Sequence, residues 1–144
     1  MTALRKSLSL KAHIIGIGFL IFGGTAAIAN DWQVLRDDSR IYSGLTVVAV
    51  GRHIHNVCSD IQARMARALV FAEGLVHHAR GLGFSRAEIN AYIDDPTEQE
   101  FYRQVARQYF AQQGADYDDA VSVCRVGRDE IATGSQIGRL LRAR

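Results

Sequence analysis

Two histidines and a cysteine lie within six residues of one another, at His53, His55 and Cys58 in the segment RHIHNVCS. Imidazole and thiolate groups bind metals and act as bases or nucleophiles. On a helix, however, residues two positions apart point to nearly opposite sides, whereas a helical zinc pair is spaced by three or four positions. The adjacent residues His77 and His78 are also unsuited to bind one metal ion together, because neighbouring residues on a helix do not face each other. We therefore predict no metal ligands and no cofactor-binding residues.

The sequence contains two cysteines, Cys58 and Cys124. In an exported protein, an even pair of cysteines is most simply interpreted as a disulfide, and Cys124 falls on the apolar face of a predicted helix. The alternative is a reactive thiol at Cys58, because a nearby helix start lowers the pKa of a thiol. We favour the disulfide, which would stabilise the fold by roughly 4 kcal/mol because it closes a long loop.

The N-terminus has the pattern of a secretory signal peptide. A segment with three basic and no acidic residues is followed by an apolar run over residues 14–29, which ends in the small-x-small pattern Ala27-Ile28-Ala29. This run is shorter than the ~20 residues that a membrane-spanning helix needs. We predict that residues 1–29 are a cleavable signal peptide and that residues 30–144 form a single domain. An uncleaved anchor is the alternative.

Export would also change the charge of the protein. The whole chain carries 17 basic and 15 acidic residues, a net charge of +2. Three basic and no acidic residues lie in the predicted signal peptide, so the mature chain would have a net charge of −1. This balance removes the electrostatic basis for nucleic-acid binding. The mature chain also contains no lysine, which excludes lysine Schiff-base chemistry. We predict a periplasmic or secreted protein without a transmembrane span in its mature chain.

Apolar residues recur at helical spacing along the mature chain, and helix start signals precede several segments. Ser59 and Gln62 form one capping-box pattern, and Ser85 and Glu88 form a second. Asp95 precedes a proline, which suits the first position of a helix. We predict an all-α fold, a small bundle of four to five short helices cross-linked by one disulfide. The predicted helices cover residues 37–56, 59–80, 85–94, 96–113 and 119–133.

Three of these helices carry further expectations about packing. The first contains TVVAV, which has strand propensity, but we favour a helix because no other strand candidate is present to pair with it. The second carries an alanine-rich stripe that would let a neighbouring helix approach closely. This stripe comprises Ile61, Met65, Ala68, Ala72, Val76 and Ala79. Farther along, the aromatic residues between Phe101 and Phe110 are expected to pack in the core.

No catalytic signature is present in the sequence. It lacks a nucleophile elbow, a zinc-protease helix, a glycine-rich phosphate loop and a calcium loop. Paired acids occur at Asp37-Asp38, Asp94-Asp95 and Asp118-Asp119, but they fall near predicted helix starts or in loops. Helix capping and compensation of the helix dipole explain acids at such positions. We therefore predict no catalytic residues.

The last seven residues, GRLLRAR, combine charge with apolar surface. Arg139, Arg142 and Arg144 accompany Leu140 and Leu141, a composition that suits docking on an acidic partner or weak contact with an anionic membrane surface. We take these five residues as a candidate partner-docking element. The alternative is a helical tail whose leucines cover the core.

Two segments, CSDIQARMARAL and CRVGRDEIATGSQIGRLLR, resemble a secreted rhodobacterial (alphaproteobacterial) family with domain of unknown function 5333. The resemblance covers roughly residues 35–142. It implies export, two cysteines and a helical fold. The family has no assigned activity, so no catalytic residue can be carried over from it.

We interpret the chain as an exported helical protein without enzymatic activity, a periplasmic partner-binding or accessory protein of an envelope complex. One alternative is a periplasmic acid-stress chaperone, because four mature histidines and 15 carboxylates would change the net charge as pH falls. Another alternative is an enzyme whose site is assembled across helices.

Overall fold

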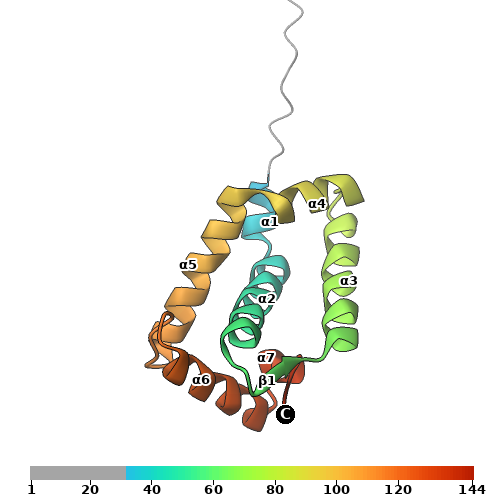
Figure 1. The fold of residues 1–144 in the computed structure, drawn as a ribbon. Helices are drawn as coiled ribbons and strands as arrows, with labels where there is room; N and C mark the ends of the chain where they lie inside the picture. Colours follow the sequence, from blue (N-terminus) through green and yellow to red (C-terminus); the bar gives the residue numbers. More distant parts are fainter. Residues whose placement is uncertain (1–31) are drawn as a thin grey trace, which may run out of the picture.

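Most of residues 32–144, which are the residues that the computed structural model describes, form helices (Figure 1). The predicted signal peptide lies outside these residues. The elements, in chain order, are α1 (Gln33–Asp37), α2 (Ser39–Val57), β1 (Ile61–Ala63), α3 (Met65–Gly81), α4 (Arg86–Asp94), α5 (Pro96–Gln112), α6 (Ala120–Thr133), α7 (Gln136–Arg139) and β2 (Leu141–Ala143). The all-α fold class is therefore confirmed, with the addition of two short strands.

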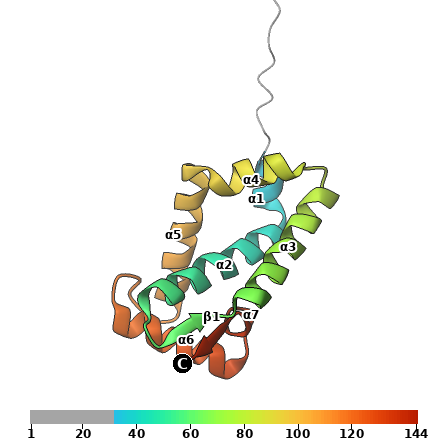
Figure 2. The ribbon, with the colours of Figure 1, turned by 45° about the vertical axis from the view of Figure 1, so that its right-hand side comes forward.

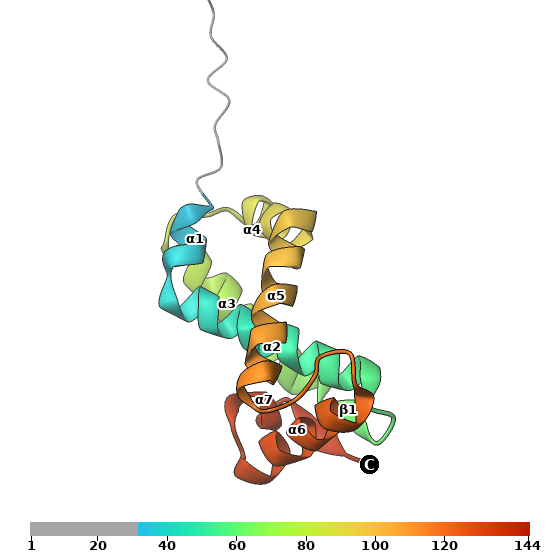
Figure 3. The same cartoon turned by 90° about the vertical axis from the view of Figure 1, so that its left-hand side faces the viewer.

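Helix α2 lies at the centre of the domain. It contacts α1, α3, α5, α6, α7 and β1. Figure 1 shows α3 and α5 on opposite sides of α2, with α1 and α4 at one end of the molecule. Figures 2 and 3, from two further directions, show α6, α7 and the short sheet at the other end. Because α3 and α5 lie on opposite sides of α2, neither helix covers the surface of the other that faces away from α2.

Side chains cap helices in three places, and two of these, Ser85 and Asp95, are start signals that act as predicted. Asp38 caps α2, because its side chain accepts hydrogen bonds from the second and third backbone amides of the helix. Ser85 and Glu88 form a reciprocal capping box at α4. Asp95 caps α5, whose first residue is Pro96. These caps fix where α2, α4 and α5 begin, and they set the ends of the helices that surround the core.

The predicted helix start at Ser59 is wrong, because the chain is extended there. Residues Ile61–Ala63 form β1, which pairs antiparallel with Leu141–Ala143, and α3 begins only at Met65. The capping-box pattern at Ser59 therefore starts no helix. The pairing buries Ile61 at 1% exposure, and this tertiary contact overrides the local helix signal. The segment TVVAV lies in α2, as expected, but the assumption that the sequence holds no other strand candidate is wrong.

The apolar interior consists of two clusters of buried residues, and Ala49 of α2 packs against both. One cluster joins the end of α2 to α5, α6 and the sheet, and it includes Ile54 and Phe110. The other joins the start of α2 to α1, α3, α4 and α5, and it includes Ile41 and Tyr92. Each fully buried large side chain contributes about 1.5–3 kcal/mol to stability. Because α2 supplies buried side chains to both clusters, both depend on it.

Gly127 lets α6 approach α2 and β1 closely. A Cβ atom at this position would lie 2.6 Å from Cγ2 of Ile54 and 2.8 Å from Cδ1 of Ile61. Both of these side chains are buried at 1% exposure or less, so they have little room to move. The contact between α6 and the centre of the domain therefore requires glycine.

Gly127→Ala should lower the free energy of unfolding by about 1–3 kcal/mol, because the added methyl group overpacks the core. Gly74→Ala in α3 is the matched control, since a Cβ atom there would meet nothing within 4 Å. Replacing a helical glycine by alanine at such a site should be neutral or stabilising. Urea titration of both variants measures the difference, and equal midpoints for the two variants would contradict the close approach of α6.

Candidate functional site

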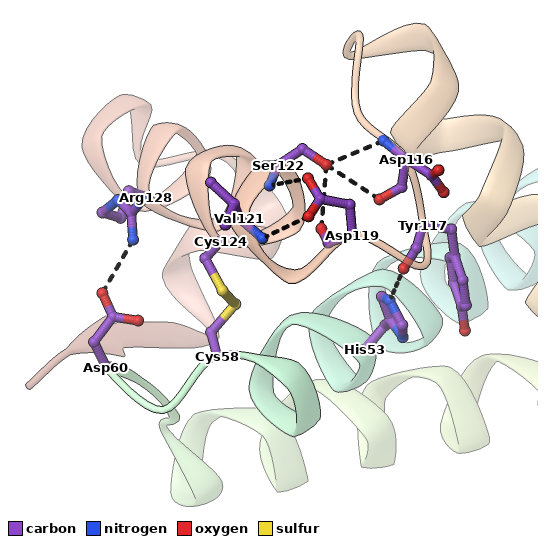
Figure 4. Close-up of a disulfide and its surroundings, with 10 residues drawn as sticks. All are labelled: His53, Cys58, Asp60, Asp116, Tyr117, Asp119, Val121, Ser122, Cys124 and Arg128. Atoms are coloured by element: carbon purple, nitrogen blue, oxygen red, sulfur yellow. Dashed lines mark hydrogen bonds and ion pairs between the residues drawn. A yellow bond between two sulfur atoms is a disulfide. The ribbon is translucent and has the colours of Figure 1, made fainter.

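A disulfide joins Cys58, which ends α2, to Cys124 in α6 (Figure 4). The two Cα atoms are 5.6 Å apart, and Cys58 is only 3% exposed. The predicted disulfide is confirmed. The alternative of a reactive thiol at Cys58 is wrong, because its sulfur is bonded and its side chain is buried. The bond holds α6 against the end of α2, so its role is structural.

Three of the histidines lie in separate environments. Nε2 of His53 lies 2.8 Å from the carbonyl oxygen of Tyr117, and the two rings stack with centroids 3.6 Å apart; Figure 4 shows this contact beside the disulfide. His55 accepts a hydrogen bond from the backbone of β1. His78 reaches instead to the start of α2. Within residues 32–144, no group of three or more His, Cys, Asp or Glu side chains is arranged to hold a metal ion.

The contact between His78 and Asp38 joins α3 to the start of α2. Nε2 of His78 lies 3.0 Å from each carboxylate oxygen of Asp38. The backbone hydrogen bond from Ile41 lowers the pKa of Asp38 most, and His78 lowers it further. One carboxylate therefore both caps α2 and fixes the far end of α3.

Asp38→Asn keeps a side chain that can cap α2 but removes its charge. At neutral pH the variant should be less stable by about 0.5–1 kcal/mol, the scale of a charge at a helix terminus. Because the pKa of Asp38 is lowered in the folded protein, its contribution is complete above the ordinary carboxyl pKa. The contribution is lost as pH falls through the folded value.

The difference in unfolding free energy between wild type and Asp38→Asn should therefore shrink as pH is lowered from about 7 to about 3. Urea titrations across this range measure it. A difference that does not change with pH would mean that the charge of Asp38 does not contribute to stability.

A groove of about 410 Å³ lies between α2, α4 and α5. Its polar lining includes Arg52, Asn56 and Arg103. Glu98, 2% exposed, also lines it, and both of its oxygens accept hydrogen bonds from Arg36 of α1. This buried carboxylate is therefore paired rather than available to act as a base.

Two tyrosines lie beside Glu98 in the same groove. The hydroxyl oxygens of Tyr92 and Tyr102 are 3.3 Å apart. Burial raises the pKa of both phenols above the ordinary value, so they stay protonated near neutral pH. Tyr102 belongs to the predicted aromatic stripe, and it packs in the core at 7% exposure, as expected. Phe101, on the neighbouring side of α5, is 39% exposed, so this part of the stripe does not pack as expected.

The C-terminal tail does not present its leucines to a partner. Leu140 is 9% exposed and Leu141 is 1% exposed, and Leu141 begins β2. Both leucines are buried, as in the alternative in which they cover the core, and Leu141 belongs to the core cluster that joins α2, α5 and α6. Arg139, Arg142 and Arg144 are exposed, so only the charged part of the predicted element faces solvent.

Helix α3 instead exposes large apolar side chains. Of its 17 residues, only Leu75 and Ala79 are buried. Met65 and Leu69 are each 61% exposed, and Val70 is 75% exposed. Met65 and Leu69 are four positions apart and therefore neighbours on the helix, and Val70 lies about 100° farther round its exposed half. We call Met65, Leu69 and Val70 the outer face of α3.

The alanine-rich stripe predicted for this helix packs only near the C-terminal end of the helix, where Ala79 is buried and Val76 packs against the core. Met65 and Ala72 were placed in the stripe, but both are exposed. The helix packs through Leu75, which lies so close to Gly44 of α2 that a Cβ atom at Gly44 would be 2.4 Å from it. Because Ile61 belongs to β1, it does not extend the packed side of α3. The sequence analysis did not predict that several large apolar side chains of this helix are exposed.

A family model described as a family of unknown function (DUF5333) matches residues 33–142. The chain belongs to this family. The match begins in α1 and ends in β2, so it covers nearly all of the described domain. No curated protein and no solved structure matches the chain. Membership of the DUF5333 family, which the two quoted segments indicate, is thus confirmed; rhodobacterial origin and secretion stay predictions.

Proposed function

We propose that this DUF5333 protein is a non-enzymatic, periplasmic or secreted protein that binds a partner protein through the outer face of α3. The observation that carries the proposal is the exposure of Met65, Leu69 and Val70 at 61%, 61% and 75%. Burying an apolar side chain of this size contributes about 1.5–3 kcal/mol. Grouped apolar side chains on a protein surface are typical of interaction sites.

Two observations support an extracytoplasmic location. The disulfide between Cys58 and Cys124 is compatible with an oxidising compartment, where such bonds form and persist. The N-terminal pattern predicts export. Among residues 32–144, no helix has the length and apolar composition needed to cross a membrane. An accessory role in an envelope complex fits these features.

The acid-stress chaperone alternative would need the domain to open in mild acid. Hydrogen bonds hold the pKa values of several carboxyl groups below their ordinary range. These groups are Asp38, Glu88, Glu100, Asp118 and Asp119. A group with a lowered folded pKa loses its contribution to stability only as pH falls through that lower value. The titration of these carboxyl groups therefore gives the domain no reason to open in mild acid.

The enzymatic alternative would place its site in the groove between α2, α4 and α5. There Glu98 is paired with Arg36, and burial keeps Tyr92 and Tyr102 protonated. A general base must be free to accept a proton near the working pH. The pairing of Glu98 and the protonation of both tyrosines therefore argue against a general base in this groove.

The double substitution Leu69→Gln and Val70→Gln tests the proposed function. Both side chains are exposed, so the free energy of unfolding should change by no more than about 0.5 kcal/mol per site. Proteins that co-purify with the wild-type chain from its own envelope extract should be lost from the variant, because the apolar contact is removed. Val121→Gln on α6 is the control, since Val121 is also 75% exposed. Unchanged recovery of the same proteins by the double variant would overturn the proposal.

A further inference from the structure

Two open hollows share Val70 and Phe71 of α3 in their linings. The first, of about 440 Å³, lies between α3 and α2 and is lined by Gly44 and Val47. The second, of about 520 Å³, lies between α3 and α7 and is lined by Leu140. Val70 and Phe71 line both hollows. Val70, at one edge of the outer face of α3, thus adjoins apolar depressions that reach two neighbouring helices, whereas Met65 and Leu69 line neither hollow.

The charged residues around these hollows are all arginines. Arg40 lines the first hollow, and Arg67 and Arg139 line the second, whereas no aspartate or glutamate lines either. The described residues offer Arg40 and Arg67 no ion pair. The side chain of Arg139 donates one hydrogen bond to the carbonyl oxygen of Gly134. Three guanidinium groups therefore border an apolar surface without local compensation.

We propose that the outer face of α3 and its two hollows bind an amphipathic helix of a partner protein that carries acidic residues beside its apolar stripe. This inference rests on the proposed function and names the chemistry of the partner. Apolar side chains one helical turn apart, about 5.4 Å, suit a surface with two adjoining apolar depressions. Carboxylates beside the stripe form charge-assisted hydrogen bonds with the arginines.

The shape and charge of the surface favour such a helix over two other occupants. A flat anionic bilayer would leave the two hollows unfilled, although it would satisfy the arginines. A second copy of this chain would bring its own arginines to the contact. The only acid in α3 is Glu73, and it already pairs with Arg86 of α4 at 2.9 Å. A separate acidic helix satisfies both the apolar hollows and the positive border.

The test is a selection from a displayed library of about 18-residue helices with a fixed apolar stripe. The positions beside the stripe vary among Glu, Lys and Gln. The library is first passed over the immobilised Leu69→Gln/Val70→Gln variant, which removes peptides that bind elsewhere on the protein. The immobilised mature protein then captures the remaining peptides that bind. We expect Glu to be enriched over Lys severalfold beside the stripe. No enrichment over the variant, enrichment of Lys, or no charge preference would overturn the inference.

A pair of charge reversals then locates the positive border. Arg67→Glu should weaken binding of the selected peptide at least fivefold, because it replaces an attraction by a repulsion. Arg52→Glu, in an exposed position on α2 away from both hollows, should leave the affinity unchanged. Equal effects of the two reversals would contradict the inference. Thermal melting of both variants checks that each one is folded.

Binding of an anionic membrane or of a second copy of this chain would give a separate experimental outcome. Sedimentation with vesicles of phosphatidylglycerol, or dimerisation at micromolar concentration, would overturn the inference if either depends on Leu69 and Val70. The two proposals can also fail separately. If the double variant loses its co-purifying proteins but the library shows no acidic preference, only the partner chemistry is wrong. If the double variant keeps those proteins, the proposed function itself is wrong.

Discussion

The cross-link between Cys58 and Cys124, together with the pairing of β1 and β2, is the constraint on which the rest of the domain depends. The disulfide fixes α6 to the end of α2, and the two strands bring the last residues of the chain back to the segment between α2 and α3. A disulfide of this kind stabilises the fold mainly by restricting the unfolded chain. The end of α2, α6, α7 and the tail are thereby held as one unit.

This arrangement determines which surface stays uncovered. The tail pairs with β1 and buries Leu141, so it cannot lie over α3. Helices α4 and α5 lie at the end of the molecule and on the far side of α2 (Figure 1). Helix α3 packs on α2 mainly through Leu75 and Ala79, and nothing in the described chain covers Met65, Leu69 and Val70. The exposed outer face is a consequence of the topology.

Local chemistry made much of this fold predictable. Asp38, Ser85 and Asp95 begin helices because a side-chain oxygen satisfies backbone amides a few residues on, and this requires no knowledge of the rest of the chain. The disulfide was predictable because only two cysteines are present. The strand pair was not predictable, because Ile61–Ala63 and Leu141–Ala143 lie far apart in the sequence and meet only in the folded domain. The same limit applied to the candidate site, since the exposure of Val70 depends on where α2, α7 and the tail lie.

The central claim is that the outer face of α3 meets another protein in the cell. Site-specific photocrosslinking tests it most directly, with a photoreactive amino acid placed at Leu69 in one strain and at Val121 in another. Both positions are exposed apolar sites on helices, at 61% and 75%. The account predicts a discrete crosslinked product from position 69 and none from position 121. No product from position 69, or the same products from both positions, would contradict it.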